Sequence, residues 1–356
     1  MKTSNDLIIY ITHDRSIGSE AAVINSTRRA EVLTLIGFRV EMYSHKLKNF
    51  LQDFWFLAKK VRHAKYVYIR IDGSMILDKF TLLKFFSWNT KFIWEIHGFP
   101  EENYNTNYTM PTRLARQRKY LKRYALSCLI DASIFISQEL LQFAKSKMVL
   151  HTSAVIPNFV NISKTLRQST TTFRLLCPDA YIVLWGGFTQ LHWQGIDILE
   201  HAARHVYAKD PSIIFLVVGG DGWHKFSWRK NILFLNSMPR NIFLEFIARS
   251  NICLALYHKP KHTPFYFSPL KILDYMMYHK PVIATNQPTI ASIISHNHNG
   301  ILTNNNPRSL ATQILQLKKD VALSKRIGEN AFKVLQEKFS QKTAAELYAS
   351  FFKSLT

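Results

Sequence analysis

The stretch FYFSPLKILDYMMYHKPVIAT, residues 265–285, predicts a loop, a helix and a strand in direct succession. Ser268 suits the N-cap of the helix because its hydroxyl can accept from a backbone amide. Pro269 suits the first helical position, where no amide hydrogen is needed. Ile272 and Met276 repeat at helical spacing and are expected to face a core. The β-branched run PVIAT is typical of a buried strand, so the stretch indicates one helix and one strand of a parallel α/β sheet.

The same alternation of β-rich and amphipathic runs extends over the whole chain. Candidate strands of the first half are LIIYI at 7–11, FRVEMY at 38–43, YVYIRI at 66–71, FIWEIH at 92–97, ASIFIS at 132–137 and AVIP at 154–157. Those of the second half are YIVLWGG at 181–187, IIFLVVGG at 213–220, NILFLN at 231–236, ICLAL at 252–256, PVIAT at 281–285 and GILT at 300–303. The segment 161–179 between the two series is rich in Ser and Thr, lacks a sustained period and is interpreted as a linker. Two doubly wound domains with parallel sheets are therefore predicted, and such sheets bind ligands beyond the carboxyl ends of their strands.

The composition is that of a soluble globular protein. The 356 residues are 47% hydrophobic and 20% charged, which is enough for two hydrophobic cores. No apolar run reaches the roughly 18 residues of a membrane-spanning helix, and the first residues lack the pattern of a signal peptide, so a cytoplasmic location is expected. The cysteines Cys128, Cys177 and Cys253 lie far apart, which favours free thiols in a reducing compartment. The absence of a GxGxxG or P-loop motif argues against dinucleotide dehydrogenases and NTPases.

An excess of cations indicates an anionic partner. Lys and Arg number 46 against 24 Asp and Glu, which gives a formal charge of +22. The segment 111–128 contains no acid, has an apolar side at helical spacing, and carries Arg113, Arg116, Arg118, Lys119, Lys122 and Arg123. A basic amphipathic helix of this kind lies on anionic lipid, and a solvated helix face is the alternative. The charge alone also suggests a nucleic-acid-binding protein, but no recognisable reader motif supports that class.

The start of the helix in 265–285 has the properties of a phosphate site. The amides of Leu270 and Lys271 are expected to point out of the first turn, where the helix dipole adds to the charge of Lys271. Asp274, three residues further on, is expected on the same side and can accept hydrogen bonds from ribose hydroxyls. The alternative is a capped surface helix with a Lys and Asp pair.

The run SPLKILDYM followed by PVIAT resembles the donor-binding helix of glycosyltransferase family 4, the glycosyl transferases group 1. Segments that resemble this family in the same order are WEIHGFPEE at 94–102, VIPNFVN at 155–161, VLWGGFTQLHWQGIDIL at 183–199 and FLVVGGDG at 215–222. The resemblance covers nearly the whole chain. It implies an α/β fold of two Rossmann-like doubly wound domains facing a cleft (GT-B). The acceptor-side domain would comprise 1–165, joined by a C-terminal helix 340–356, and the nucleotide-sugar-binding domain would comprise 175–339.

The resemblance also assigns site residues, position by position. The donor-binding residues that it implies are Gly18, Ser19, Gly187, Asn236, Ser268, Pro269, Leu270 and Asp274. Asp274 matches the second glutamate of a paired-glutamate signature and would bind the ribose, whereas Tyr266 stands in place of the first glutamate. Phe188 and Gln194 replace an Arg and a Lys that are usual in the family. Lys271 is therefore expected to be the principal cation at the diphosphate.

His97, at the end of a predicted strand, is expected to bind the donor sugar, and it is a catalytic candidate together with Lys271. The resemblance implies retaining transfer of a sugar from a nucleoside diphosphate to a hydroxyl of a glycan or lipid-linked acceptor, without metal or other cofactor. The setting would be cell-surface polysaccharide or glycoconjugate synthesis, on the inner face of the cytoplasmic membrane. The alternatives are a sugar-nucleotide epimerase of GT-B shape, a catalytically degenerate protein and a nucleic-acid-binding protein.

Overall fold

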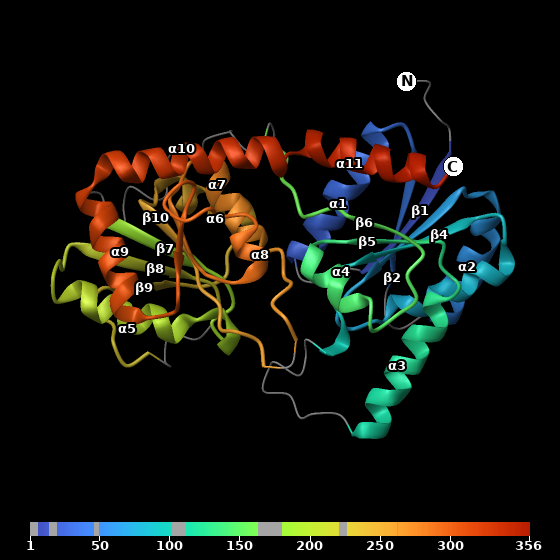
Figure 1. The fold of residues 1–356 in the computed structure, drawn as a ribbon, viewed down its shortest axis with the longest axis horizontal. Coiled ribbons are helices and arrows are strands. Elements are labelled where there is room, and N and C mark those ends of the chain that lie inside the picture. Colours follow the sequence, from blue (N-terminus) through green and yellow to red (C-terminus); the bar gives the residue numbers. More distant parts are fainter. Residues whose placement is uncertain are drawn as a thin grey trace. The chain divides into compact units, whose positions relative to one another are not determined.

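The computed structural model describes residues 6–13, 20–45, 50–101, 112–162, 180–220, 226–261 and 263–356 (Figure 1). The chain divides into two compact units. The first comprises Met1–Phe159, Lys261–Ser268 and Gln341–Thr356, and the second comprises Val160–Pro260 and Pro269–Ser340. The return of the chain end to the first unit was expected, but the return of Lys261–Ser268 was not.

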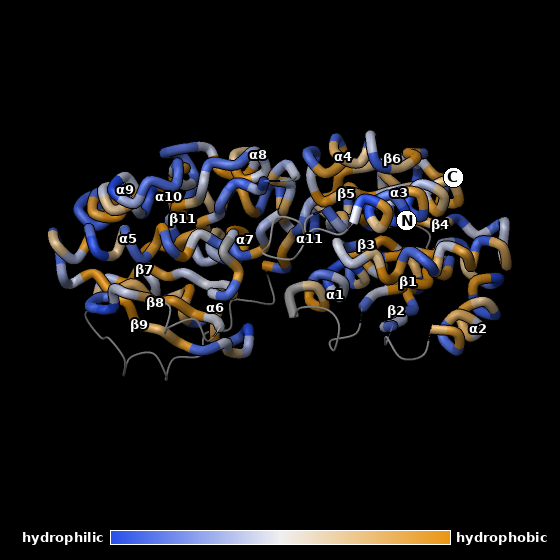
Figure 2. The backbone as a smooth tube through the Cα atoms, turned by 90° about the horizontal axis from the view of Figure 1, so that it is seen from below, coloured by the Kyte–Doolittle hydropathy of each residue, from blue (hydrophilic) through white to orange (hydrophobic). Residues whose placement is uncertain are grey.

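In the first unit, the described strands form one six-stranded parallel sheet in the order β2-β1-β3-β4-β5-β6. The strands are β1 (Leu7–His13), β2 (Arg39–His45), β3 (Tyr66–Ile71), β4 (Lys91–Ile96), β5 (Ala132–Phe135) and β6 (Thr152–Val155). The central strands are buried on both faces, which explains why their sequences are almost continuously hydrophobic (Figure 2).

Helices cover both faces of this sheet. They are α1 (Glu20–Leu35), α2 (Phe50–Lys60), α3 (Arg113–Ser127), α4 (Gln138–Ala144), α11 (Gln341–Ser354) and the 3₁₀ helices η2 (Val61–His63) and η3 (Leu77–Phe86). One core contains Val32 of α1 and Phe352 of α11. The core on the opposite face contains Leu57 of α2 and Leu83 of η3.

In the second unit, the described strands form another six-stranded parallel sheet, in the order β12-β11-β10-β7-β8-β9. The strands are β7 (Tyr181–Gly186), β8 (Ile213–Val218), β9 (Ile232–Leu235), β10 (Ile252–Ala255), β11 (Val282–Thr285) and β12 (Ile301–Thr303). The helices are η6 (His192–Gln194), α5 (Ile196–Tyr207), α6 (Arg240–Arg249), α7 (Leu270–Met277), α8 (Pro288–Ala291), α9 (Pro307–Lys319) and α10 (Val321–Lys338). One hydrophobic core of this unit contains Trp185 of β7, Leu199 of α5 and Ile314 of α9.

Each predicted strand region overlaps a strand, and the predicted pair of Rossmann-like doubly wound sheets is confirmed. The predicted start of α7 is wrong by one residue. Pro269, not Ser268, is the N-cap, and no side chain caps the helix. The Ser268 carbonyl instead accepts a hydrogen bond from Asn158 Nδ2 at 2.8 Å, which holds this residue to the first unit.

Candidate functional site

In the second unit the chain builds the sheet outward from β7 to β8 and β9 on one side, and then from β10 to β11 and β12 on the other side. The strand order therefore reverses between the neighbours β7 and β10. The carboxyl ends of two such strands border the crevice in which open α/β sheets bind ligands. β7 ends at Gly186 and β10 ends at Ala255. The residues that follow these two strands therefore mark the first place to look for a ligand site in this unit.

The Lys271 ammonium group lies at this place. Its Nζ is 5.0 Å from the ring centroid of Trp185 in β7 and 5.0 Å from that of Tyr257, just after β10. It also donates a hydrogen bond to Gln194 Oε1 at 3.3 Å. Gln194 stands where the resemblance would place a cation, and here it orients the neighbouring cation instead. Lys271 thus points from the first turn of α7 toward the point where the strand order reverses.

The charge of Lys271 is poorly compensated. Burial lowers the pKa of this amine to about 7, and no carboxylate of the described residues opposes that effect. The two aromatic rings stabilise the ammonium form through their faces but leave its charge largely unneutralised. A bound anion would therefore find in Lys271 a cation without a counter-ion among the described residues.

Two glycines allow the turns after β7 and β8 to approach one another. A Cβ atom on Gly187 would lie 2.1 Å from Gln194 Oε1, the atom that accepts from Lys271. Gly219, after β8, has a φ of 116°, and a Cβ on it would lie 2.0 Å from the Gly187 carbonyl oxygen. Gly187 therefore acts on the site by leaving room for Gln194.

Asp274 lies on the same helix as Lys271, but its carboxylate faces α6. Arg240, the first residue of α6, donates from Nη1 to Asp274 Oδ2 at 2.7 Å and from Nη2 to Oδ1. Asp274 is only 2% exposed. Each carboxylate oxygen can accept more than one hydrogen bond, so the arginine pair leaves acceptor capacity at Asp274. The predicted ribose contact stays a prediction.

The other predicted donor-binding residues lie in different surroundings. Asn236 is exposed directly after β9, and Leu270 is half-buried at the start of α7. Phe188, next to Gly187, is 53% exposed. Gly18 and Ser19 lie outside the described residues.

Tyr266, which stands in place of the family's first glutamate, is fully buried in the core of the first unit. Its backbone carbonyl accepts from Ser137 Oγ at 2.9 Å, and its ring lies 5.5 Å from that of Phe143. An apolar partner at this position anchors the segment Lys261–Ser268. This explains why a tyrosine, not a carboxylate, suits the position.

His97 follows β4 in the first unit and contacts two charged side chains. Its Nε2 lies against Glu95 Oε1 and is 3.0 Å from Arg70 Nη1. Burial, followed by the charge of Arg70, lowers the pKa of His97 to about 4. At Nε2 the Glu95 carboxylate can only accept and the Arg70 guanidinium can only donate, so the two contacts favour opposite tautomers of the neutral ring. The contact with Glu95 is the closer of the two and favours the proton on Nε2. The Nδ1 atom is then left as an acceptor.

Glu95 is the centre of a buried network that fixes this ring. Its carboxylate accepts from Tyr10 Oη at 2.6 Å and pairs with Arg29 Nε. Burial raises the pKa of Glu95, but Arg29 and then His97 outweigh it and hold the pKa well below its usual range. Arg29 also donates to Tyr348 of α11, so the last helix supports the same network.

Sequence reasoning missed three of these positioning residues. Arg29 and Arg240 are buried partners from distant helices, and a single arginine in an amphipathic run gives no signal of such a role. Asn158 does have a signal, because it is the Asn of VIPNFVN. Its Oδ1 accepts from Asn25 Nδ2 at 2.6 Å while its Nδ2 binds the Ser268 carbonyl, so the motif could have been given a structural role.

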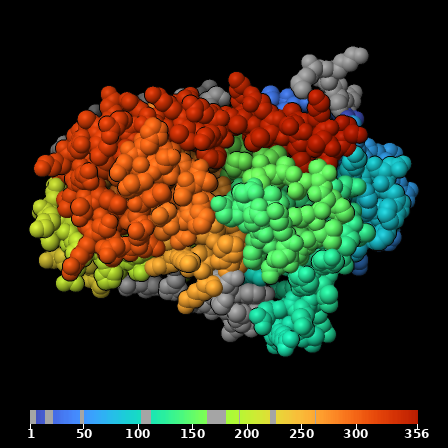
Figure 3. All heavy atoms as spheres, viewed as in Figure 1, coloured from blue at the N-terminus to red at the C-terminus, as the bar shows by residue number. Residues whose placement is uncertain are grey.

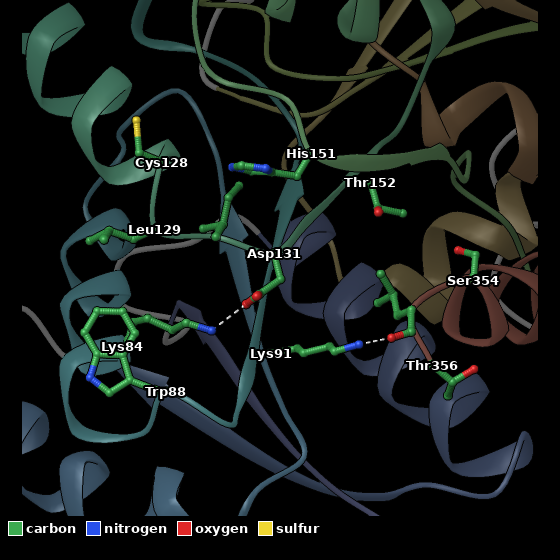
Figure 4. Close-up of a pocket in the computed structure, with 12 residues that line it drawn as sticks. Lys84, Trp88, Lys91, Cys128, Leu129, Asp131, His151, Thr152, Ser354 and Thr356 are labelled. Carbon is green, nitrogen blue, oxygen red and sulfur yellow. Dashed lines mark hydrogen bonds and ion pairs between the residues drawn. The ribbon is translucent and has the colours of Figure 1, made fainter.

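A cavity of about 640 Å³ in the first unit lies at the amino ends of the strands, opposite to the carboxyl ends that His97 follows (Figure 4). Lys91 and Thr152, the first residues of β4 and β6, line it together with Lys84, Asp131 and His151. Lys84 is paired with Asp131 at 2.8 Å, and Lys91 donates to the Leu355 carbonyl. Because ligands of α/β sheets bind at carboxyl edges, we do not assign the donor to this cavity.

The described residues contain no group of three or more His, Cys, Asp or Glu side chains arranged to hold a metal ion. A search of the same residues for a helix long and apolar enough to cross a membrane found none.

Comparisons with known proteins bear on both the second unit and the whole fold. Residues 179–320 match the family model of Glycosyl transferases group 1. The uncharacterized glycosyltransferase MJ1178 of Methanocaldococcus jannaschii is 30% identical over 152 residues. This match spans 41% of the present chain and 41% of the relative, so it covers about two fifths of either protein.

Solved structures extend the similarity to the whole chain. Anabaena Alr3699/HepE in complex with UDP superposes with a TM-score of 0.73 at 16% identity, over 98% of this chain and 100% of that one. Sucrose-phosphate synthase from Thermosynechococcus elongatus gives 0.72 at 15% identity, over 99% of each chain. The fold is therefore that of the GT-B glycosyltransferases. Within that class, the predicted resemblance to the group 1 enzymes is confirmed in residues 179–320, and the narrower assignment to family 4 stays a prediction.

Proposed function

We propose that the protein is a glycosyltransferase that moves a sugar from a nucleoside diphosphate to a hydroxyl of a glycan or lipid-linked acceptor, with retention at the anomeric carbon. The observation that carries the proposal is the position of Lys271, a half-buried cation at the point where the strand order of the second sheet reverses. The match of residues 179–320 to group 1 glycosyl transferases supports the reaction class. One solved structure of Anabaena Alr3699/HepE contains UDP, and another of the same protein contains UDP and glucose.

Lys271 would stabilise the negative charge that develops on the departing diphosphate. In free protein near pH 7, about half of the Lys271 side chains carry a proton, because their pKa is about 7. A diphosphate raises that pKa by supplying the missing counter-charge, so binding and protonation favour each other. A preorganised cation beside the leaving group is usually among the largest contributions to such catalysis. This role replaces the two cations that Phe188 and Gln194 do not provide.

His97 would position the donor sugar and not act as an acid. Its pKa of about 4 leaves the ring neutral at physiological pH, and the close contact with Glu95 favours the proton on Nε2. The Nδ1 atom can then accept a hydrogen bond from a sugar hydroxyl. In the proposed reaction the bond from the anomeric carbon to the diphosphate breaks, the bond to the acceptor oxygen forms, and a departing phosphate oxygen takes the acceptor proton. The proposal includes no metal, as the resemblance implies.

We also propose contact of α3 with an anionic membrane surface, which fits a cytoplasmic enzyme of cell-surface polysaccharide or glycoconjugate synthesis. Arg113, Arg116 and Lys119 are exposed on this helix, which stands out from the first unit (Figure 3). Two predicted contact residues are less suited. Arg123 is 2% exposed and binds Glu101 through both terminal nitrogens at 3.0 Å, and Lys122 is paired with Asp78 at 2.7 Å.

A panel of sugar nucleotides tests the proposal. Melting temperature is measured with each compound, and the compounds that raise it are then incubated with the protein and candidate acceptors. Release of the nucleoside diphosphate with a new glycoside supports transfer, whereas conversion of the sugar nucleotide without an acceptor indicates the epimerase alternative. No shift with any nucleoside diphosphate would remove the transferase proposal.

Two variants test the placement of the donor site. Lys271→Ala and Asp274→Ala are each expected to weaken donor binding. Unchanged affinity in both would show that the donor binds elsewhere. Dialysis against a chelator, followed by the same binding assay, tests the absence of a metal from the proposed reaction.

A further inference from the structure

The first unit exposes a group of large apolar side chains on the outer side of α2 and η3. We name it the α2–η3 surface and define it by Leu51, Trp55, Phe56, Leu82, Phe85 and Trp88, all of which are exposed. Trp55 is 57% exposed and Trp88 is 65% exposed. Soluble proteins rarely leave several such side chains together in water unless they contact something.

Ring contacts join Trp55 and Trp88 of this surface to η3. The Trp55 ring of α2 lies 5.6 Å from the ring of Phe86 at the end of η3, in an edge-on contact. Phe85 and Trp88 are also 5.6 Å apart. The inner sides of the same elements are in the core, where Leu57 and Leu83 are buried. The elements that carry the outer aromatic side chains are therefore anchored in the core of the first unit.

The neighbourhood of the surface is strongly cationic. η3 is linked to the basic helix α3 by the ion pair between Asp78 and Lys122. Lys122 is offset by Asp78, and the other exposed cations of α2, η2 and α3 are Lys59, Arg62, Arg113, Arg116, Arg118 and Lys119. α2 and η3 carry the acids Asp53 and Asp78, and both are paired, Asp53 with His45 at 2.6 Å. α3 carries no acid.

We propose that the α2–η3 surface inserts into the interfacial region of an anionic phospholipid bilayer while α3 contacts the headgroups beside it. Tryptophan is enriched at bilayer interfaces, where its ring meets both the acyl chains and the polar headgroups. Exposed lysines and arginines near such rings are attracted by acidic lipids. The inference rests on the membrane contact proposed above for α3, and it adds an apolar contribution that α3 alone does not supply.

Two other occupants fit the surface less well. A second copy of the chain would bring two surfaces of the same strong positive charge together, because a twofold interface pairs each patch with itself. Single-stranded nucleic acid stacks its bases on aromatic rings. Leu51, Leu82 and the exposed Leu114 and Leu121 of α3 offer no ring for stacking, but they suit acyl chains.

Quenching of tryptophan fluorescence by brominated lipids tests the insertion. The full chain is mixed with vesicles of phosphatidylcholine and phosphatidylglycerol whose acyl chains carry bromine. Quenching is expected for the wild type and is expected to be lost in the double variant Trp55→Phe, Trp88→Phe, which keeps two apolar rings and should still bind the vesicles. Trp228→Phe in the second unit is the control, because this half-buried tryptophan also lies beside cations and should not contribute to the quenching.

Vesicle flotation measures the apolar contribution. Trp55→Ala with Trp88→Ala is expected to lower the partition coefficient at least about tenfold, because two large rings no longer leave water. Arg116→Glu with Lys119→Glu should lower binding to anionic vesicles only. Quenching that persists in the Phe double variant, equal partitioning of the Ala variant, or dissociation of a dimer by the Ala variant would overturn the inference.

Donor binding is a separate measurement. Melting temperature with the sugar nucleotide panel should respond equally in the wild type and in the Trp55 and Trp88 variants. Binding to vesicles without binding to any sugar nucleotide would support the bilayer contact and contradict the proposed function. Binding to a sugar nucleotide without binding to vesicles would support the proposed function and contradict the bilayer contact.

Discussion

Replacement of Lys271 by Met tests whether its ammonium group binds the donor diphosphate. Met keeps an unbranched apolar side chain between Trp185 and Tyr257 but carries no charge. In the free protein, burial lowers the pKa of Lys271 from 10.5 to about 7. A bound diphosphate favours the ammonium form, so donor binding takes up a proton. The dissociation constant of the wild type should therefore rise as the pH rises above 7.

The size of this effect follows from the pKa. If only the ammonium form binds, the dissociation constant rises about fivefold from pH 7 to pH 8 and about tenfold per further pH unit. The Met variant lacks the titrating group, so its dissociation constant should be flat over this range. At pH 7 it should bind at least about tenfold more weakly, because a hydrogen bond to a charged group contributes about 1.5–3 kcal/mol.

The same substitution should raise the stability of the free protein. The lowered pKa of Lys271 means that the unfolded chain binds more protons than the folded protein between pH 7 and pH 10.5, so the stability of the wild type rises with pH in that window. Met removes this cost of burying the amine. A higher melting temperature at pH 7, measured without ligand, is the expected result.

Titration calorimetry with a sugar nucleotide gives the dissociation constants. A sugar nucleotide is preferred to a free nucleoside diphosphate, whose terminal phosphate itself titrates near pH 6. Lys280→Met is the matched control, because burial also lowers the pKa of Lys280, which lies beyond the other end of α7. A flat pH dependence in the wild type, or an unchanged slope in Lys271→Met, would refute the role of Lys271.

Two further substitutions probe the support of the site. Glu95→Gln should lower the free energy of unfolding by about 3–5 kcal/mol, because Arg29 loses its buried counter-charge. Glu41→Gln, which removes the exposed ion pair with Arg39, is the control and should lower the free energy of unfolding by less than about 1 kcal/mol. Because the pKa of Glu95 is held below its usual value of 4.5, the stability that Glu95 contributes is present above pH 4.5 and is lost as the pH falls below 4.5. Acid unfolding of the two variants measures this loss. Gly187→Ala should displace Gln194, because the new methyl group would lie 2.1 Å from its Oε1, and donor affinity should fall while a melting scan still shows a cooperative transition. An unchanged donor affinity in Gly187→Ala would argue against Gln194 as the group that orients Lys271.

The sequence predicted the strands and the position of Lys271 because both depend on local patterns. Buried parallel strands read as continuous hydrophobic runs, and a helix that begins after Pro269 places Lys271 in its first turn. The partners of the site could not be predicted in this way. Arg240 meets Asp274 across 34 residues of sequence, and Arg29 meets Tyr348 across 319. Such pairs depend on how the helices pack onto the sheets, and the local hydrophobic period of a sequence does not predict that packing.

The dependence of the first unit on α11 has a consequence for synthesis of the protein. Tyr348 and Phe352 of α11 complete a core whose other members include Ile8, Tyr10 and Tyr68. A growing chain emerges from the ribosome with its N-terminal residues first. This apolar face of β1 and β3 therefore stays exposed to water until α11 has been made. The second unit lacks this requirement, because its residues lie between 160 and 340. The part of the protein that is translated first is therefore the part that finishes folding last, and until then it is the more exposed of the two to aggregation and to chaperones.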